Sequence, residues 1–304
     1  MSSKHQLFLL LGLSLAAIFQ TVATAQEAPS AEAPSAAAKA TPTIEADVVY
    51  GHKMGMALTL DVIRPEKQNG AAVIFVVSGG WNSNWFPPET YRRVEMLNEL
   101  VNRGYVVILL RHGSAPLFKV PDAVADVKKA IKFLHDKCGD FGFEANRMGV
   151  CGMSAGGHLS LMLGTDTNST KSPDKSEEAA SPKNSAKVAA VVAYFPPTDL
   201  RSMVGPSRDF PALDFDKAKG EDVSPLVCVT PDDAPTLLIH GTKDRLVPLR
   251  HSEEIKAAFD EDKVPCELIT IEGAGHGFRG DDSKRATQAS IEWFDRFLNE
   301  QGNK

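Results

Sequence analysis

Short apolar segments alternate with amphipathic segments along this sequence, and this alternation constrains the fold more than any other feature. The apolar segments read as strands, and the clearest is the continuous run AAVIFVV at residues 71–77. Continuous apolar runs are typical of strands that are buried on both faces of a parallel sheet. Further predicted strands lie at residues 105–110, 147–153, 188–195, 235–241 and 266–273.

Segments with helical spacing of apolar residues separate these predicted strands. They lie at residues 88–104, 121–139, 154–165, 249–263 and 284–300. Alternating strands and helices predict an α/β fold, in which helices cover both faces of a mostly parallel central sheet. Two earlier segments, residues 47–51 and 56–65, predict an antiparallel start to that sheet.

Two polar segments interrupt the alternation. Residues 166–187 are rich in Ser and Lys, which predicts a solvated surface insertion. Residues 196–234 are rich in Pro and Asp and have no regular periodicity, so we expect a small irregular cap there. Because ligands bind at the carboxyl ends of the strands in such sheets, functional residues are expected in the loops that directly follow strands.

The first 25 residues have the three parts of a secretory signal peptide. Lys4 supplies a positive charge, residues 7–19 form an apolar run, and Ala-Thr-Ala precedes Gln26 as a cleavage site. The apolar run is too short to span a membrane. We therefore expect a signal peptide at residues 1–25, export to the periplasm or the medium, and no membrane span after cleavage. The alternative is an uncleaved membrane anchor.

The rest of the chain divides into a linker and one domain. Residues 26–44 consist largely of Ala, Pro, Ser and Glu and lack apolar periodicity, which predicts a disordered linker. Residues 45–304 contain all the predicted strands and helices and are expected to form a single domain.

Charge and cysteine content limit the partners and cofactors of this domain. The formal net charge is −6, the isoelectric point is about 5.8, and no block of Lys or Arg stands out. These values predict neither a nucleic-acid partner nor an anionic membrane partner. The spacing of the four cysteines resembles no zinc site, and export would leave three complete disulfide pairings open. The cysteines are Cys138, Cys151, Cys228 and Cys266.

Ser154 lies in the sequence Gly152-Met153-Ser154-Ala155-Gly156, between a predicted strand and a predicted helix. A serine nucleophile on a sharp strand-to-helix turn needs small neighbours, because larger side chains would clash there. The start of the helix also favours negative charge beside the serine. Ser154 is therefore a candidate nucleophile, and the alternative is an ordinary strand-to-helix turn.

A serine nucleophile requires a base, and the base requires a carboxylate that orients it. Asp244 follows one predicted strand, and His276, between glycines, follows the next. Both loops are expected at the carboxyl edge of the sheet beside Ser154, which makes Asp244 the candidate acid and His276 the candidate base. The alternatives are a turn-forming aspartate and a histidine in a glycine loop. Two other histidines are expected to be structural: His158 and His240.

The tetrahedral intermediate of such a reaction needs backbone N–H donors, which form an oxyanion hole. Ala155, directly after the nucleophile, offers one donor. The others are expected from Gly79 and Gly80, because glycines let the backbone approach an oxyanion closely. A shift of register by one residue would use Trp81 instead, and a plain glycine turn is the alternative interpretation.

The motifs GMSAGGH, PTLLIHGTKDRLVP and GAGHGF together resemble the α/β-hydrolase superfamily, over residues 45–300. The chain is similar to the esterase and lipase branch, which includes bacterial feruloyl and acetyl-xylan esterases and hormone-sensitive-lipase-like esterases. The resemblance implies a triad of Ser154, Asp244 and His276 without a metal ion or cofactor. The usual H-G-G-G-W motif aligns with VSGGW at residues 77–81, which lacks the histidine and the first glycine. This departure favours the feruloyl and acetyl type.

These features predict an exported serine hydrolase with a catalytic domain at residues 45–304, which cleaves short-chain acyl esters of small molecules or polysaccharides. One alternative is a serine peptidase of the prolyl-oligopeptidase type, although such enzymes usually carry a propeller domain before the hydrolase domain. Another is a non-catalytic binding protein, which would be expected to lack a triad member. Three aromatic residues after the predicted oxyanion loop are candidates to line a pocket or to pack under the loop: Trp81, Trp85 and Phe86.

Overall fold

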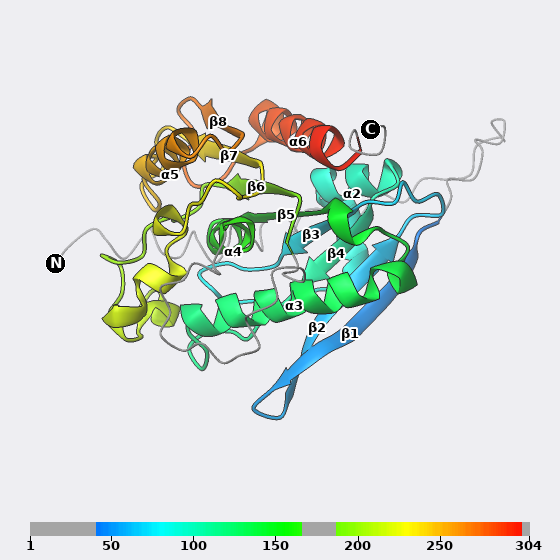
Figure 1. Ribbon diagram of the computed structural model, residues 1–304, viewed down its shortest axis with the longest axis horizontal. Helices are drawn as coiled ribbons and strands as arrows, with labels where there is room; N and C mark the ends of the chain where they lie inside the picture. Colours follow the sequence, from blue (N-terminus) through cyan, green and yellow to red (C-terminus); the bar gives the residue numbers. More distant parts are fainter. Residues whose placement is uncertain (1–40, 166–186, 300–304) are drawn as a thin grey trace, which may run out of the picture. The chain divides into compact units, whose positions relative to one another are not determined.

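The computed structural model describes residues 41–165 and 187–299, which form an eight-stranded sheet flanked by helices (Figure 1). The strands lie in the order β1-β2-β4-β3-β5-β6-β7-β8. The strands are β1 Thr43–Lys53, β2 Met56–Arg64, β3 Ala72–Val76, β4 Val106–Leu110, β5 Met148–Met153, β6 Ala190–Tyr194, β7 Thr236–Gly241 and β8 Cys266–Ile271. The α-helices are α2 Glu95–Asn102, α3 Val120–Phe141, α4 Ala155–Gly164, α5 Arg250–Glu261 and α6 Gly280–Phe294.

The strand directions confirm a mostly parallel sheet with an antiparallel start. β1 and β2 form a hairpin, and β2 also pairs antiparallel with β4. All the remaining neighbours pair in parallel, from β4 with β3 to β7 with β8. The loops that follow β3, β5, β7 and β8 therefore leave the sheet at the same edge.

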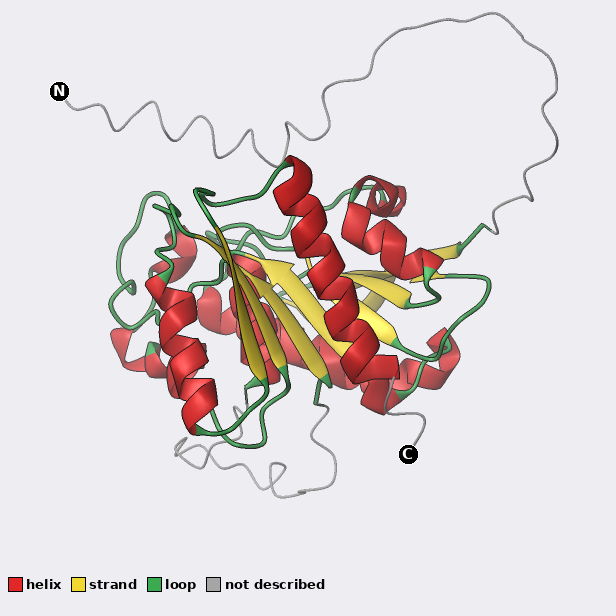
Figure 2. Cartoon of the chain, turned by 90° about the horizontal axis from the view of Figure 1, so that it is seen from above, coloured by secondary structure: helices red, strands yellow, loops and turns green. Residues whose placement is uncertain are grey.

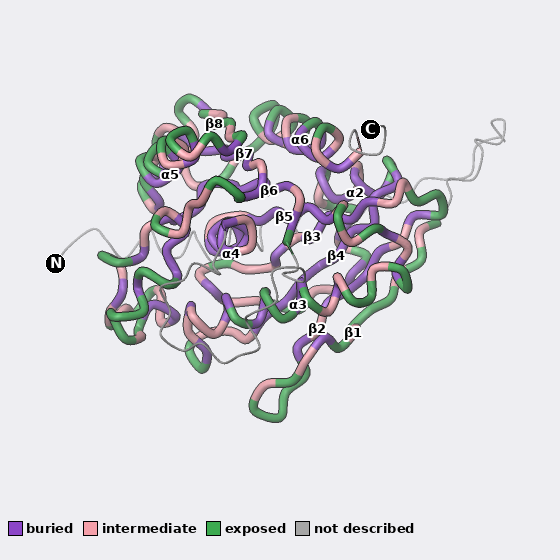
Figure 3. The backbone as a smooth tube through the Cα atoms, viewed as in Figure 1, coloured by how far each residue is buried: buried purple, intermediate pink, exposed green. Residues whose placement is uncertain are grey.

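Alternate residues of the central strands enter two hydrophobic cores, one on each face of the sheet. Ile74 and Ile108 pack in the core that includes residues of α3, α4 and α5. Val73 and Val107 pack in the other core, with residues of α2 and α6. Figure 2 shows helices on both sides of the sheet, and Figure 3 shows the central strands as buried. Burial on both faces explains why these strands are continuously apolar in sequence.

The predicted helix at residues 88–104 is two elements in the structure. Pro88–Arg93 form a 3₁₀ turn, η1, and α2 begins only at Glu95. Val94 separates them because its φ of −97° and ψ of 103° are extended. The apolar spacing nevertheless marks the buried side correctly, since residues of both elements pack in the same core.

The sheet begins slightly earlier than the predicted domain. Thr43 and Ile44, assigned above to a linker at residues 26–44, pair with the last two residues of β2. They belong to the sheet because β2 is long enough to offer them partners. The expected signal peptide, the linker up to residue 40 and residues 166–186 of the expected insertion lie outside the described residues.

The expected cap segment, residues 196–234, contains only short 3₁₀ turns. They are η4 Pro211–Leu213, η5 Lys217–Lys219, η6 Glu221–Val223 and η7 Pro225–Val227. The irregular structure expected from its Pro and Asp content is confirmed. Across the described ranges, the helices are too short or too polar to cross a membrane.

Candidate active site

Ser154 stands at the turn between β5 and α4. Its φ of 54° and ψ of −118° are values that residues other than glycine rarely adopt. The backbone N–H of Ser154 donates a hydrogen bond to the carbonyl oxygen of Tyr194 at 2.9 Å, which fixes the turn against the end of β6. A strained backbone of this kind persists only where the surroundings impose it, and such positions cluster at functional sites.

Gly152 and Gly156 permit this turn because other backbone atoms pass close to both of them. A Cβ atom on Gly152 would lie 2.4 Å from the carbonyl group of Gly156. A Cβ atom on Gly156 would lie 2.6 Å from the carbonyl oxygen of Val76 in β3. Because both obstacles are backbone, no side-chain movement could relieve them. The glycine spacing of the motif is therefore a steric requirement of the turn.

His276 lies between Ser154 and Asp244. Its Nδ1 is 2.6 Å from Oδ2 of Asp244, and its Nε2 is 2.9 Å from Oγ of Ser154. A carboxylate can only accept, so Nδ1 carries the proton of the neutral ring and Nε2 accepts from the serine hydroxyl. The structure thus brings together the three predicted residues in the order nucleophile, base and orienting acid.

Asp244 is held as a carboxylate. Its Oδ1 accepts hydrogen bonds from the N–H groups of Leu246, at 2.9 Å, and Val247, at 3.0 Å. Burial alone would raise the pKa of the Asp244 carboxyl, but hydrogen bonds from His240 and His276 hold this pKa well below its usual range. Asp244 therefore remains charged at neutral pH where it faces His276.

His240 is fully buried beneath this carboxylate. Its Nε2 lies 2.8 Å from the carbonyl oxygen of Val247 and 3.5 Å from Oδ2 of Asp244. Its Nδ1 lies 2.7 Å from Oγ of Ser252. Both ring nitrogens are thus engaged with the loop and helix around Asp244, which fits the structural role expected for His240.

The loop after β3 changes the expected set of oxyanion donors. The N–H of Gly79 donates to the carbonyl oxygen of Asn82 at 2.9 Å, so Gly79 cannot donate to a substrate and leaves the set. The N–H groups of Gly80, Trp81 and Ala155 have no acceptor among the described residues. The donors available beside Ser154 are therefore Ala155 together with Gly80 or Trp81.

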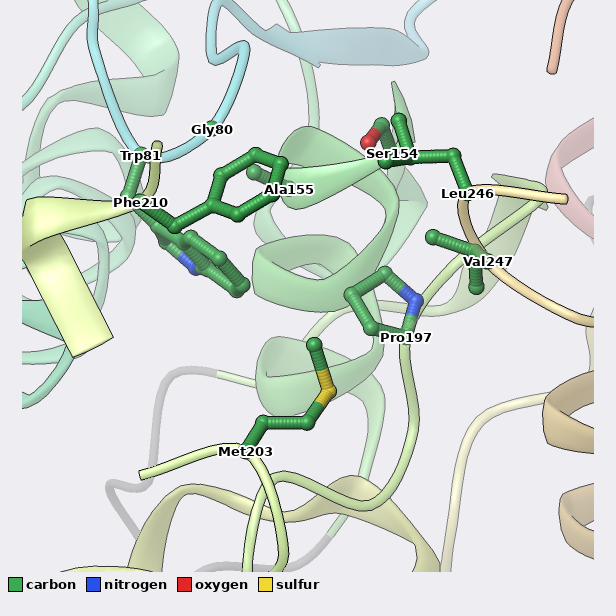
Figure 4. Close-up of a pocket in the computed structure, with 9 residues that line it drawn as sticks. All are labelled: Gly80, Trp81, Ser154, Ala155, Pro197, Met203, Phe210, Leu246 and Val247. Atoms are coloured by element: carbon green, nitrogen blue, oxygen red, sulfur yellow. The ribbon is translucent and has the colours of Figure 1, made fainter. Parts of the chain in front are cut away.

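A small apolar pocket opens beside Ser154 (Figure 4). Its other lining residues are Gly80, Trp81, Ala155, Pro197, Met203, Phe210, Leu246 and Val247. The cavity volume is about 30 Å³, on a scale on which one buried water needs ~10–15 Å³. The lining includes the candidate oxyanion donors and two residues of the loop after Asp244, but not His276. The pocket therefore lies beside Ser154 between the loop after β3, the cap and the loop after Asp244.

Trp81 and Trp85, two of the three candidate aromatic residues, do not line the same site. Trp81 is buried and lines the pocket. Trp85 is 56% exposed and donates its indole N–H to Asp47 at 3.2 Å, outside the pocket lining. Sequence reasoning missed Met203 and Phe210 of the cap, since nothing in an irregular segment indicates which side chains turn inward. It also missed Phe195, which follows β6 at the carboxyl edge and packs against His276.

The cysteines take no part in the site. Cys138, Cys151 and Cys266 carry free thiols, and Cys151 is fully buried within β5. Burial raises the pKa of the Cys151 thiol far above its usual range, so this cysteine behaves as a small apolar side chain.

Known esterases share this sequence pattern. Residues 60–259 match the BD-FAE family, a range that includes Ser154 and Asp244. The esterase LipC of Mycobacterium tuberculosis is 30% identical over 251 residues, which cover 76% of this chain and 59% of LipC. The acetylxylan esterase of Xylanibacter ruminicola is 24% identical over 227 residues, which cover 70% of this chain and 42% of that enzyme. This chain thus spans three fifths or less of the length of these two relatives.

A solved structure shares the fold as well. A truncated carbohydrate esterase from gut microbiota superposes with a TM-score of 0.67 at 26% identity, covering 85% of this chain and 98% of that chain. The sheet order, the strand-to-helix turn at Ser154 and this similarity identify the α/β-hydrolase fold. The chain belongs to the BD-FAE family of α/β-hydrolase esterases.

Proposed function

We propose that this protein is an exported serine esterase that removes short acyl groups, above all acetyl groups, from polysaccharide esters. The observation that carries the proposal is the continuous series of hydrogen bonds from Asp244 through His276 to Ser154, at 2.6 Å and 2.9 Å. The esterase names of LipC and of the acetylxylan esterase support the reaction class.

The first half of the reaction forms an acyl-enzyme. Oγ of Ser154 attacks the ester carbonyl carbon while its proton passes to Nε2 of His276. Asp244, already ionised, stabilises the imidazolium that forms. The carbonyl oxygen becomes an oxyanion and accepts hydrogen bonds from the N–H of Ala155 and from that of Gly80 or Trp81.

The second half of the reaction releases both products. Nε2 of His276 gives its proton to the leaving alcohol oxygen, and the acyl group remains on Ser154. A water molecule then gives a proton to His276 and attacks the acyl carbonyl. His276 then returns this proton to Oγ of Ser154 as the second tetrahedral intermediate collapses, which frees the carboxylic acid and restores the Ser154 hydroxyl.

The position of the pocket supports its assignment to the acyl group. The leaving alcohol must receive its proton from His276, so the alcohol extends toward that residue and the acyl substituent extends away from it. The pocket is lined by the candidate oxyanion donors, by the cap and by Leu246 and Val247 of the loop after Asp244, without His276. A cavity volume of about 30 Å³ favours acetyl over long-chain or feruloyl groups.

A carbohydrate alcohol is proposed because two of the similar proteins carry matching names. One is called an acetylxylan esterase and the other a carbohydrate esterase. Export fits such a substrate, because the xylan of plant cell walls lies outside the cytoplasm. Protein recovered from the envelope or the medium is expected to begin at Gln26, and N-terminal sequencing that finds Met1 there would contradict export.

A substrate panel with purified protein tests the activity. Nitrophenyl acetate and acetylated xylan are expected to be hydrolysed, feruloylated arabinoxylan and nitrophenyl octanoate poorly, and aminoacyl anilides not at all. The control is Ser154→Ala, which keeps the pocket and removes the nucleophile. Cleavage of anilides in preference to esters would indicate a peptidase instead. Equal rates for the wild type and Ser154→Ala would exclude the proposed mechanism.

A further inference from the structure

The loop of residues 78–82, called the oxyanion loop from here on, contains a strained turn. Asn82 N–H donates to the carbonyl oxygen of Gly79 at 3.0 Å, and Gly80 and Trp81 have φ values of 57° and 58°. Two successive left-handed residues form a type I′ turn. Glycine accepts this conformation readily, but a side chain as bulky as that of Trp81 does so rarely. Such a turn persists only if contacts around it impose its shape.

His112, in the loop after β4, binds the start of the oxyanion loop. Its Nδ1 lies 2.8 Å from the carbonyl oxygen of Gly113, and its Nε2 lies 2.9 Å from Oγ of Ser78. The carbonyl can only accept, so Nδ1 is protonated and Nε2 of the neutral ring accepts from the Ser78 hydroxyl. Burial lowers the pKa of His112, which keeps this ring neutral. The Ser78 hydroxyl therefore donates a hydrogen bond to His112, which lies just after the neighbouring strand β4.

His158, in α4, binds the other side of the turn. The indole N–H of Trp81 donates to Nδ1 of His158 at 3.2 Å, and Nε2 of His158 lies 2.8 Å from the carbonyl oxygen of Val223. The indole can only donate, which places the ring proton on Nε2 and directs it at the cap. His158 is fully buried, and its ring meets the indole edge to face with 5.5 Å between centroids.

These contacts connect the two halves of the oxyanion hole. α4 carries His158 and also begins with Ala155, which supplies one candidate donor. The indole of Trp81 is thus hydrogen-bonded to the same helix that supplies the other candidate donor, the N–H of Ala155. Neither His112 nor His158 lines the pocket, so neither is placed to touch a substrate.

We propose that His112 and His158 are positioning residues for the oxyanion hole: by binding Ser78 and Trp81 they hold the N–H groups of the strained turn toward the ester oxygen. The inference rests on the proposed esterase function. The oxyanion exists only in the tetrahedral intermediate and its transition states. A loosened turn therefore lowers kcat and leaves KM nearly unchanged, because the bound substrate has not yet developed the charge.

The test removes one hydrogen-bond donor at a time with Ser78→Ala and Trp81→Phe. For nitrophenyl acetate, each change is expected to lower kcat about tenfold to a hundredfold. This fall in kcat is no larger than the fall that removal of a whole oxyanion donor causes. KM is expected to stay within about twofold. The inhibition constant of an alkyl trifluoromethyl ketone, which forms an oxyanion on Ser154, is expected to rise in proportion to the fall in kcat/KM.

Two controls separate positioning from folding. Stoichiometric titration of Ser154 with a nitrophenyl phosphonate counts the folded sites, so kcat is calculated per titrated site. Thr236→Val removes a buried hydroxyl at the amino edge of the sheet, where it donates to the carbonyl oxygen of Ala234, and is expected to keep kcat and inhibitor affinity. Ser78→Thr, which keeps the hydroxyl, is expected to retain more activity than Ser78→Ala.

The outcomes distinguish the positioning role of His112 and His158 from the esterase activity itself. If Ser78→Ala and Trp81→Phe keep kcat and inhibitor affinity per titrated site, or raise KM alone, the positioning role is overturned while the esterase function stands. If the wild-type protein turns over no ester and does not react with the phosphonate, the proposed function is overturned, and the positioning role is overturned with it.

Discussion

The ring of Phe195 lies against the imidazole of His276, with 4.5 Å between the ring centroids and 55° between their planes. Phe195 has a φ of 37°, which is unusual for a bulky side chain. Its ring also meets Phe278, two residues after His276, edge to face at 5.4 Å. Phe195 thus limits the rotation of the imidazole on one face and supports the loop that carries it.

Phe195→Leu is expected to lower kcat about tenfold, because small misplacements of a catalytic group are costly even when folding is intact. Leucine keeps an apolar side chain but not the flat surface against the imidazole. Turnover of nitrophenyl acetate per phosphonate-titrated site measures the effect. Phe297→Leu is the matched control, since Phe297 follows α6 and packs against Trp293 near the C-terminal end of that helix. Equal losses in both variants would contradict a specific role for Phe195.

The triad is expected to behave as a unit. Ser154→Ala and His276→Ala should each lower kcat by several orders of magnitude, and the double variant should be little worse than either. Asp244→Asn should cost somewhat less, because it disturbs the tautomer of His276 but leaves the nucleophile. Steady-state kinetics on the four proteins checks this. Effects that multiply in the double variant would show that Ser154 and His276 act independently.

Acyl preference is expected to depend on Phe210. The Phe210 ring lines the pocket, and a Cβ atom on Gly80 would lie only 3.3 Å from it. Phe210→Ala should enlarge the pocket and raise the ratio of kcat/KM for butyrate to that for acetate about tenfold, as expected for added apolar contacts. Val227→Ala is the control, because Val227 is a half-exposed residue of the same cap. An unchanged ratio in Phe210→Ala would place the acyl group elsewhere.

Stability is expected to fall in mild acid because of His158. Burial lowers the pKa of His158 from 6.5 to about 4. Between these values the unfolded chain binds a proton that the native protein does not, so the free energy of unfolding falls as the pH falls through this window. By pH 4, this linkage to His158 has lowered the free energy of unfolding by on the order of 3 kcal/mol.

His158→Gln removes this titration and keeps both a donor and an acceptor. Urea unfolding at pH 7, 5.5 and 4 should show a flatter dependence on pH in the variant than in the wild-type protein. The comparison isolates His158, because every other group is the same in the two proteins. Parallel curves for the two proteins would mean that His158 is protonated at the same pH in the folded and unfolded states.

The triad could be predicted because topology brings it together. Ser154, Asp244 and His276 each follow a strand of one parallel sheet, and parallel strands end at one edge whatever the details of their packing. The fold class could be predicted from the alternation of apolar strands and amphipathic helices along the sequence. Residues that depend on an irregular segment could not be predicted, and Met203 and Phe210 reach the pocket through such a segment.

Gly79, which was expected to be an oxyanion donor, shows a second limit on what the sequence can predict. Whether the N–H of Gly79 is available depends on its hydrogen bond to Asn82. That bond closes a turn in which Trp81 has a φ of 58°, and the indole N–H of Trp81 donates to His158, which lies 77 residues away in sequence. Local sequence indicates that glycines allow a turn, but contacts from other elements decide which turn forms.

The strand β1 closes one edge of the sheet, and its irregular shape has a consequence for how this protein behaves in concentrated solution. Its pairing with β2 shifts register between Glu45 and Val48 and again between Val49 and Gly51, and Asp47 has a φ of 54°. Bulged and charged edges are poor templates for a strand from another molecule. A variant with a straightened β1 would offer an even row of N–H and C=O groups, and would be expected to aggregate edge to edge.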